Sequence, residues 1–237
     1  MKKILSILLL VACVFSVASC NKNKGGSGFS LANYETYFAS SVPTKAVTKV
    51  SQTISTTTLE SVTTLTTGSL ADGTKASVYE SNVQTFNDIE SLELNYIKEK
   101  KTVKWYCEGK GISTNKGRTW DAEGLDFANG PIYINLDSEL YDGNISYDNA
   151  TDTLVLGVSA ENSATALASF LEDGQKFEYD STITIAASGG RISSIKVEYS
   201  VDPYDIGDDI ANMIEIEEIK VVIEASYSYD YQTINFN

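Results

Sequence analysis

The residues best equipped for covalent or metal chemistry are three cysteines, Cys13, Cys20 and Cys107. A thiol can pair in a disulfide, ligate a metal, attack a substrate or receive a covalent modification. The chain contains no histidine, which excludes Ser-His-Asp and Cys-His catalysis and zinc sites built on imidazole. Carboxylate-only hydrolysis and Ser-Lys mechanisms remain, but no motif points to either. We therefore expect a protein that is not an enzyme and that uses no cofactor.

Two of the cysteines belong to a segment with the pattern of a secretory signal. Lys2 and Lys3 form a short positive region, and residues 4–17 are nearly all apolar. This run of about 14 residues is shorter than the roughly 20 that a membrane-spanning helix needs, and it fits the apolar region of a signal peptide. Cys20 follows directly after the small residues Ala18 and Ser19.

The sequence Val17-Ala18-Ser19-Cys20 resembles the lipobox of bacterial lipoproteins. The resemblance implies that residues 1–19 are removed, that Cys20 carries a lipid, and that the protein is extracytoplasmic and anchored to the bacterial membrane or envelope. The alternative is an ordinary signal peptide with an incidental cysteine. Residues 20–30 include the polar run "NKNKGGSG", a composition typical of a flexible tether. Several acyl chains would hold the protein firmly at the membrane.

The third cysteine has no thiol left to pair with. Cys107 lies in "TVKWYCEG", where it alternates with Val103 and Trp105. This alternation predicts a buried strand residue rather than a reactive thiol, which needs an activating cation nearby.

The chain is strongly acidic. Without Lys2 and Lys3, 16 basic residues stand against 32 acidic ones, a net charge of −16. Nucleic-acid binding requires a basic surface, so we expect no nucleic-acid partner.

One acidic cluster has the oxygen ligands that calcium prefers. It consists of Asp202, Asp205, Asp208 and Asp209. Their spacing differs from the EF-hand order. We favour a solvated acidic turn and predict no metal site.

The residue pattern after the tether is that of alternating strands with few helices. Helices are expected at 31–41, at 44–54 after a possible N-cap at Thr44, and at 161–173. Strands are expected from 56 onward, with a hairpin turn at 71–74 and another at Gly189-Gly190. The charged run at 98–101 reads as a turn between two strands, and 213–237 as long closing strand structure.

This arrangement resembles the LolA/LolB-like fold and its LppX/LprG relatives. The matching features are the lipobox, the expected helix "TKAVTKVSQTI", threonine-rich strands, the block at 161–201 and the ending "EASYSYDYQTINFN". The resemblance implies an α+β fold, a curved and mostly antiparallel sheet forming an open half-barrel, with a few helices on its concave face. It also implies an apolar cavity for acyl chains. Residues 31–237 would form one such domain.

A cavity would be lined by apolar side chains of alternating strand residues. The candidates are Leu92, Leu94, Tyr96, Val103, Trp105, Ile183, Ile185, Ile195 and Val197. Alternation alone does not separate a pocket wall from an ordinary core. Two functions therefore remain: a carrier of a lipid or other hydrophobic molecule, and a non-catalytic structural or interaction lipoprotein with a filled core.

Overall fold

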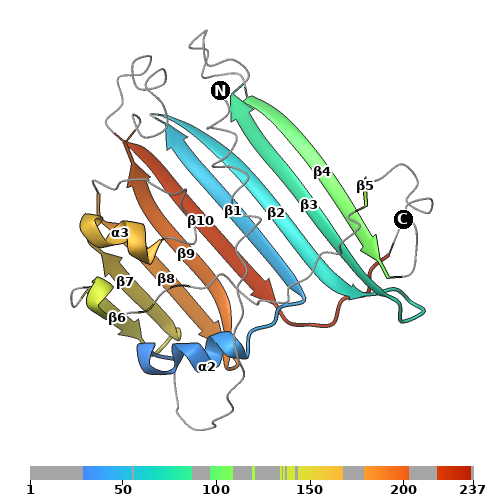
Figure 1. Cartoon of the computed structure of the whole chain (residues 1–237), viewed down its shortest axis with the longest axis horizontal. Coiled ribbons are helices and arrows are strands. Elements are labelled where there is room, and N and C mark those ends of the chain that lie inside the picture. Colours follow the sequence, from blue (N-terminus) through green and yellow to red (C-terminus); the bar gives the residue numbers. More distant parts are fainter. Residues whose placement is uncertain are drawn as a thin grey trace.

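The computed structural model describes residues 29–54, 56–86, 97–108, 119–120, 134, 136, 138–141, 144–167, 179–202 and 218–235. Within them, ten strands form a single open sheet (Figure 1). In sheet order the strands are β5 (Thr119–Trp120), β4 (Ile97–Cys107), β3 (Lys75–Phe86), β2 (Thr57–Ser69), β1 (Lys45–Ile54), β10 (Ile219–Ser228), β9 (Arg191–Val201), β8 (Ser181–Ser188), β7 (Thr153–Val158) and β6 (Ile145–Asp148).

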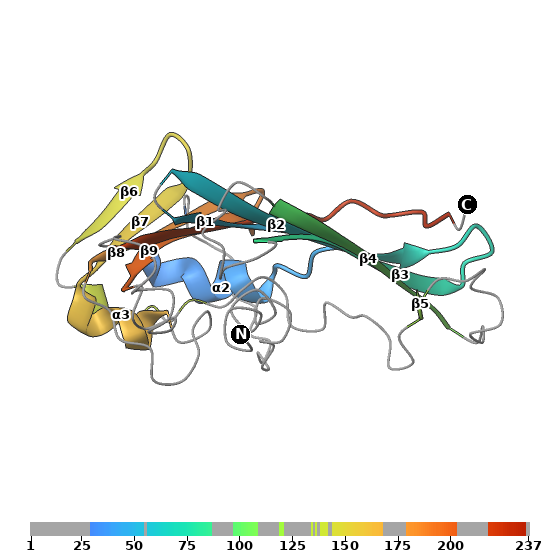
Figure 2. The same cartoon turned by 90° about the horizontal axis from the view of Figure 1, so that it is seen from above.

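All neighbouring strands are antiparallel except β4 and β5, which are parallel. The sheet is curved, and helices α2 and α3 lie on its concave side (Figure 2). The expected α+β class, with a curved antiparallel sheet and a few helices on one face, is confirmed.

The strands follow from β-branched residues separated by turns that accept unusual backbone angles. Thr, Val and Ile favour the extended conformation because their branched side chains pack well on a pleated surface. The β2–β3 turn contains Gly73 at φ 85°, and the β8–β9 turn contains Gly189 and Gly190 at φ 59° and 78°. Glycine adopts these positive angles without steric cost, so both predicted hairpins are present.

The helix predicted for 44–54 is wrong: this segment is β1, which pairs with β2 and β10. Ala46, Val50 and Ile54 are spaced by four residues, which suits one face of a helix and also one face of a strand. The segment forms a strand because its β-branched residues favour the extended conformation and it has a partner strand on each side. Such tertiary pairing overrides a weak local preference for a helix.

The charged run at 98–101 is not a turn. Residues Ile97–Cys107 form one strand that pairs with β3 along its whole length. The run lies near the outer side of the sheet and is exposed. Solvated lysines are compatible with a strand in this position.

The helices are short. They are η2 (Leu31–Asn33), α2 (Tyr34–Ala39), η4 (Ser138–Tyr141) and α3 (Ala160–Ala166). The helix expected at 31–41 is present as η2 and α2, and the described part of the helix expected at 161–173 is α3. Tyr34 and Phe38 of α2 are buried against the strands of the concave face.

The closing strand is shorter than predicted. β10 ends at Ser228, and residues 229–235 leave it to cross the ends of neighbouring strands (Figure 1). Tyr229 and Tyr231 therefore do not continue the alternation of Tyr227 in a strand, as the sequence pattern suggested.

Candidate functional site

Four of the nine apolar candidates meet on the concave face. Ile183 lies opposite Val197, and Ile185 lies opposite Ile195, on the adjacent strands β8 and β9. Their exposed fractions are 0–1%. They belong to one core cluster that also contains Tyr34 and Phe38 of α2, the buried residues of β7, and Ile219, Val221 and Ile223 of β10. This part of the concave face is filled by the protein's own side chains.

The strand register identifies the residues of the other strands that lie on the concave face, because directly opposed residues of paired strands share a face. From Val197 the opposed residues are Ile223, Val50, Ser61, Val83 and Lys100. Side chains alternate along a strand, so Lys98, Thr102 and Lys104 share the concave face with Lys100. Val103 and Trp105 lie on the convex face.

The convex candidates have different surroundings from the four on the concave face. Val103 is 37% exposed. Trp105 is partly buried and packs against a small second cluster of Ala76, Val78, Cys107 and Ile234. Cys107 is 3% exposed, as the strand alternation predicted. Leu92, Leu94 and Tyr96 lie outside the described residues.

Ile234 reaches this cluster because the C-terminal segment crosses the end of β2. The main-chain oxygen of Gln232 accepts a hydrogen bond from Ser69 N at 3.2 Å, and Ile234 N donates to Ser69 O at 2.9 Å. A Cβ atom on Gly68 would lie 2.1 Å from Gln232 O, so only glycine permits this approach. The sequence pattern does not predict this crossing, although Gly68 interrupts a threonine-rich strand, and a glycine inside a strand can mark a close approach of another backbone.

The start of the described chain is held by the β6–β7 turn. Asp152, at φ 49°, accepts a hydrogen bond from Tyr147 OH at 2.7 Å and one from Phe29 N at 3.4 Å on the same carboxylate oxygen. Loss of solvation and the Asp152 carboxylate raise the pKa of Tyr147 to about 12. The predicted tether would therefore enter the domain beside β6 and β7.

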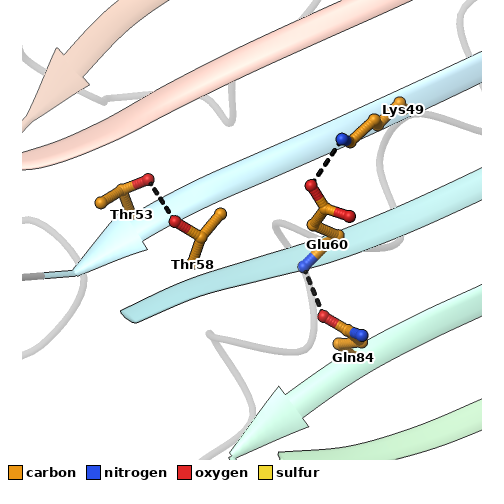
Figure 3. Close-up of polar contacts among 5 residues, drawn as sticks. All are labelled: Lys49, Thr53, Thr58, Glu60 and Gln84. Atoms are coloured by element: carbon orange, nitrogen blue, oxygen red, sulfur yellow. Dashed lines mark hydrogen bonds and ion pairs between the residues drawn. The ribbon is translucent and has the colours of Figure 1, made fainter. Parts of the chain in front are cut away.

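The convex face of β1 and β2 is polar around Lys49 and Glu60. Lys49 Nζ lies 2.5 Å from Glu60 Oε1, and Glu60 N donates to Gln84 Oε1 at 2.9 Å (Figure 3). Thr53 and Thr58 share a hydrogen bond of 2.9 Å beside them. The hydrogen bond to Glu60 raises the pKa of Lys49. Because both partners are more than a third exposed, this pair contributes little stability.

β4 carries a concentration of positive charge on this acidic chain. Lys98, Lys100, Lys101 and Lys104 fall within seven consecutive residues. The first three are exposed, and none of these three has an ion-pair partner in the part of the chain that the structure describes. We call these four lysines the basic edge.

The remaining candidates are not brought together. Asp202 is half-buried at the end of β9, while Asp205, Asp208 and Asp209 lie outside the described residues, as does Cys20. Among the described residues no group of three or more acidic or thiol side chains could hold a metal ion. No helix in the described ranges is long and apolar enough to cross a membrane.

No protein-family model matches the chain, and no curated protein matches it. Among solved structures, a DUF1329 family protein from Desulfovibrio piger is similar over 79% of this chain and 86% of its own, with 10% identity and a TM-score of 0.19. At this identity and score the similarity carries no conclusion about family or function.

Proposed function

We propose that this protein is a lipid-anchored, extracytoplasmic interaction protein without catalytic activity. The lipobox-like sequence ending at Cys20 supports the anchor. The resemblance to a bacterial lipobox supports an anchor on the outer side of the membrane. The domain would present its sheet to a partner in the envelope.

One observation favours interaction over transport of an acyl chain. Ile183, Ile185, Ile195 and Val197, which would border a ligand in a half-barrel carrier, are 0–1% exposed and packed against α2 and neighbouring strands. A bound acyl chain needs apolar side chains that are free to contact it. On this half of the concave face those side chains already contact one another.

The anchor is tested by replacing its thiol. The Cys20→Ser chain should move from the membrane fraction to the soluble fraction of cells, and metabolic labelling with a fatty acid should be lost. The control is Cys107→Ser, which should keep both membrane attachment and label. Label retained by Cys20→Ser would contradict the anchor.

The absence of cargo is tested by native mass spectrometry and lipid extraction of the Cys20→Ser chain purified from cells. We expect a mass equal to that of the polypeptide and no lipid in molar proportion. A lipid recovered at about one molecule per chain would contradict the interaction function and establish the carrier.

A carrier is the second candidate, and one part of the sheet favours it. Leu65, Tyr79 and Val83 lie on the concave face of β2 and β3 by register and are half-buried, and none belongs to the two core clusters of the described residues. If lipid is recovered, Leu65→Glu should abolish the recovery, whereas Val103→Glu on the convex face should preserve it.

A further inference from the structure

The outer side of β4 combines three properties that are separate elsewhere in the described sheet. It has unpaired strand length, a concentration of lysines, and exposed apolar side chains. β5 pairs with β4 only at Lys104 and Trp105. No other described segment pairs with the outer side of Ile97–Val103, a stretch of seven residues.

An unpaired strand offers main-chain N–H and C=O groups along its free side, and an extended peptide can satisfy them by adding a strand. β4 is not protected by being short, since it spans 11 residues. It contains no proline, and its pairing with β3 shows no register shift. Its outer side also accepts a strand already, because β5 pairs there in parallel. The backbone of 97–103 is therefore suited to a further strand.

The side chains specify what that strand would contain. Lys98 and Lys100 project to the concave side. Ile97 and Val103 project to the convex side, where they are 36% and 37% exposed and where the exposed Glu99 and Lys101 lie between them. An added strand alternates in the same way. Acidic side chains on its concave side would meet the lysines, and apolar side chains on its convex side would meet Ile97 and Val103.

The lysines also exclude competitors. A second copy pairing antiparallel through its own β4 with Lys100 opposite Lys100 would place these two lysines together, which is repulsive, while Glu99 would face Lys101 in the same pairing. Neutral strands gain nothing from the charge. Lysines on an edge strand discourage self-association. They also favour an acidic partner, because specificity is the difference between the affinity for that partner and the affinity for competing strands.

We propose that residues 97–103 of β4 bind an extended peptide segment with alternating acidic and apolar residues, by β-strand addition. The proposal deepens the interaction function above and rests on it, because it names the surface and the chemistry of the partner. A purely anionic surface such as a lipid membrane would use the lysines but neither the free main chain nor Ile97 and Val103.

The test uses the full-length protein in detergent and a fluorescein-labelled heptapeptide, Val-Glu-Val-Glu-Val-Glu-Val, read by fluorescence anisotropy. We expect saturable binding that weakens as salt rises, because the charge pairs are exposed. The double substitution Lys98→Glu/Lys100→Glu should weaken binding by about tenfold or more, since attraction becomes repulsion. Lys75→Glu/Lys220→Glu changes the net charge equally, away from this edge, and should weaken it by less than about threefold.

Two further peptides separate strand addition from simple charge attraction. Each is methylated on one of the two alternating sets of main-chain nitrogens and keeps all the charges. Successive N–H groups of a strand point to opposite sides, so only one of the two peptides loses the hydrogen bonds that it would donate to β4. That peptide should bind about tenfold more weakly than the parent, as loss of main-chain hydrogen bonds predicts. Binding of both methylated peptides equal to that of the parent, or no saturable binding of the parent, would overturn the proposal.

Binding to vesicles that contain anionic phospholipid tests whether the lysines recognise a membrane instead. This experiment uses the Cys20→Ser chain so that a lipid attached to Cys20 does not contribute to vesicle binding. We expect that the double substitution Lys98→Glu/Lys100→Glu does not change the binding of the chain to these vesicles. Vesicle binding lost in that variant, with no peptide binding, would assign the basic edge to the membrane and overturn the proposal. These outcomes leave the interaction function standing, since it fails only if lipid cargo is recovered from the purified chain.

Discussion

Tyr229, the first residue after β10, donates its phenolic hydrogen to the main-chain oxygen of Ile192 near the start of β9. The N–H of Ile192 donates in turn to Ser41 Oγ at 2.7 Å, and that hydroxyl donates to Tyr37 O at 2.6 Å. The Arg191 guanidinium lies 4.9 Å from the centre of the Tyr229 ring. This junction fastens the end of α2, the β8–β9 hairpin and the C-terminal segment to one another.

Removing the hydroxyl of Tyr229 should loosen this junction. In Tyr229→Phe the buried oxygen of Ile192 loses its donor, so the free energy of unfolding should fall by about 1–2 kcal/mol. Urea denaturation measures the change. The control Tyr231→Phe, at a side chain that is 72% exposed, should change stability by less than about 0.5 kcal/mol. Equal effects of the two substitutions would contradict the role of the junction.

The two faces of the sheet should respond differently to the same truncation. Ile195→Ala removes a side chain that is 1% exposed in the main core, and should lower the free energy of unfolding by about 3 kcal/mol. Val103→Ala, on the convex face, should cost less than about 1 kcal/mol. Chemical denaturation of both variants tests the face assignment, which a larger loss at Val103 would refute.

Closing the gap at Gly68 should displace the C-terminal segment. The new Cβ of Gly68→Ala would meet a main-chain oxygen, which moves only with the backbone of Gln232. Ile234 should then move away from Cys107, and the thiol of Cys107 should become more accessible to solvent. In a chain with Cys13 and Cys20 replaced by serine, the thiol labelling rate of Cys107 should rise by about tenfold, because local opening controls access to a buried group.

The matched control for Gly68→Ala is Gly190→Ala. It strains the β8–β9 turn at φ 78° but meets no atom within 4 Å. It should lower stability without changing the labelling rate of Cys107 under native conditions. A labelling rate that follows global stability in both variants would rule out a local role for the C-terminal crossing.

The raised pKa of Tyr147 predicts that the protein loses stability at alkaline pH. The pKa of Tyr147 in the folded protein is raised to about 12, above the value of about 10 for an unfolded chain. A raised pKa means that the folded state keeps its proton longer than the unfolded state does. The stabilisation is thus complete below about pH 10 and is lost as pH rises toward about 12.

Thermal denaturation between pH 9 and pH 12 measures this dependence. Tyr147→Phe should flatten the decline in melting temperature, because the titrating hydroxyl is gone. Burial also raises the pKa of Tyr199, so part of the decline should remain. Tyr231→Phe should leave the curve unchanged, and an unchanged curve for Tyr147→Phe would contradict the assignment.

Alternation and turn residues in the sequence predicted most of the strands. Ile195 and Val197 alternate with polar neighbours, and Gly189-Gly190 marks a hairpin, so β8 and β9 were predictable from local pattern. The pattern was ambiguous at β1, where apolar residues four apart fit either period. The pattern was misleading at Lys98–Lys101, where a run of charged residues suggested a turn although these residues belong to a strand near the edge of the sheet.

The sequence by itself determined the α+β class, the hairpins and the expectation of a lipid on Cys20, because these depend on residues close together in the chain. Tertiary structure decided which face each strand residue occupies. Val103 and Ile195 have similar local patterns, yet register through six strands places them on opposite faces. The contact of Ile234 with Cys107 likewise joins distant segments. Such contacts depend on strand pairing across the whole sheet, which no local window of residues contains.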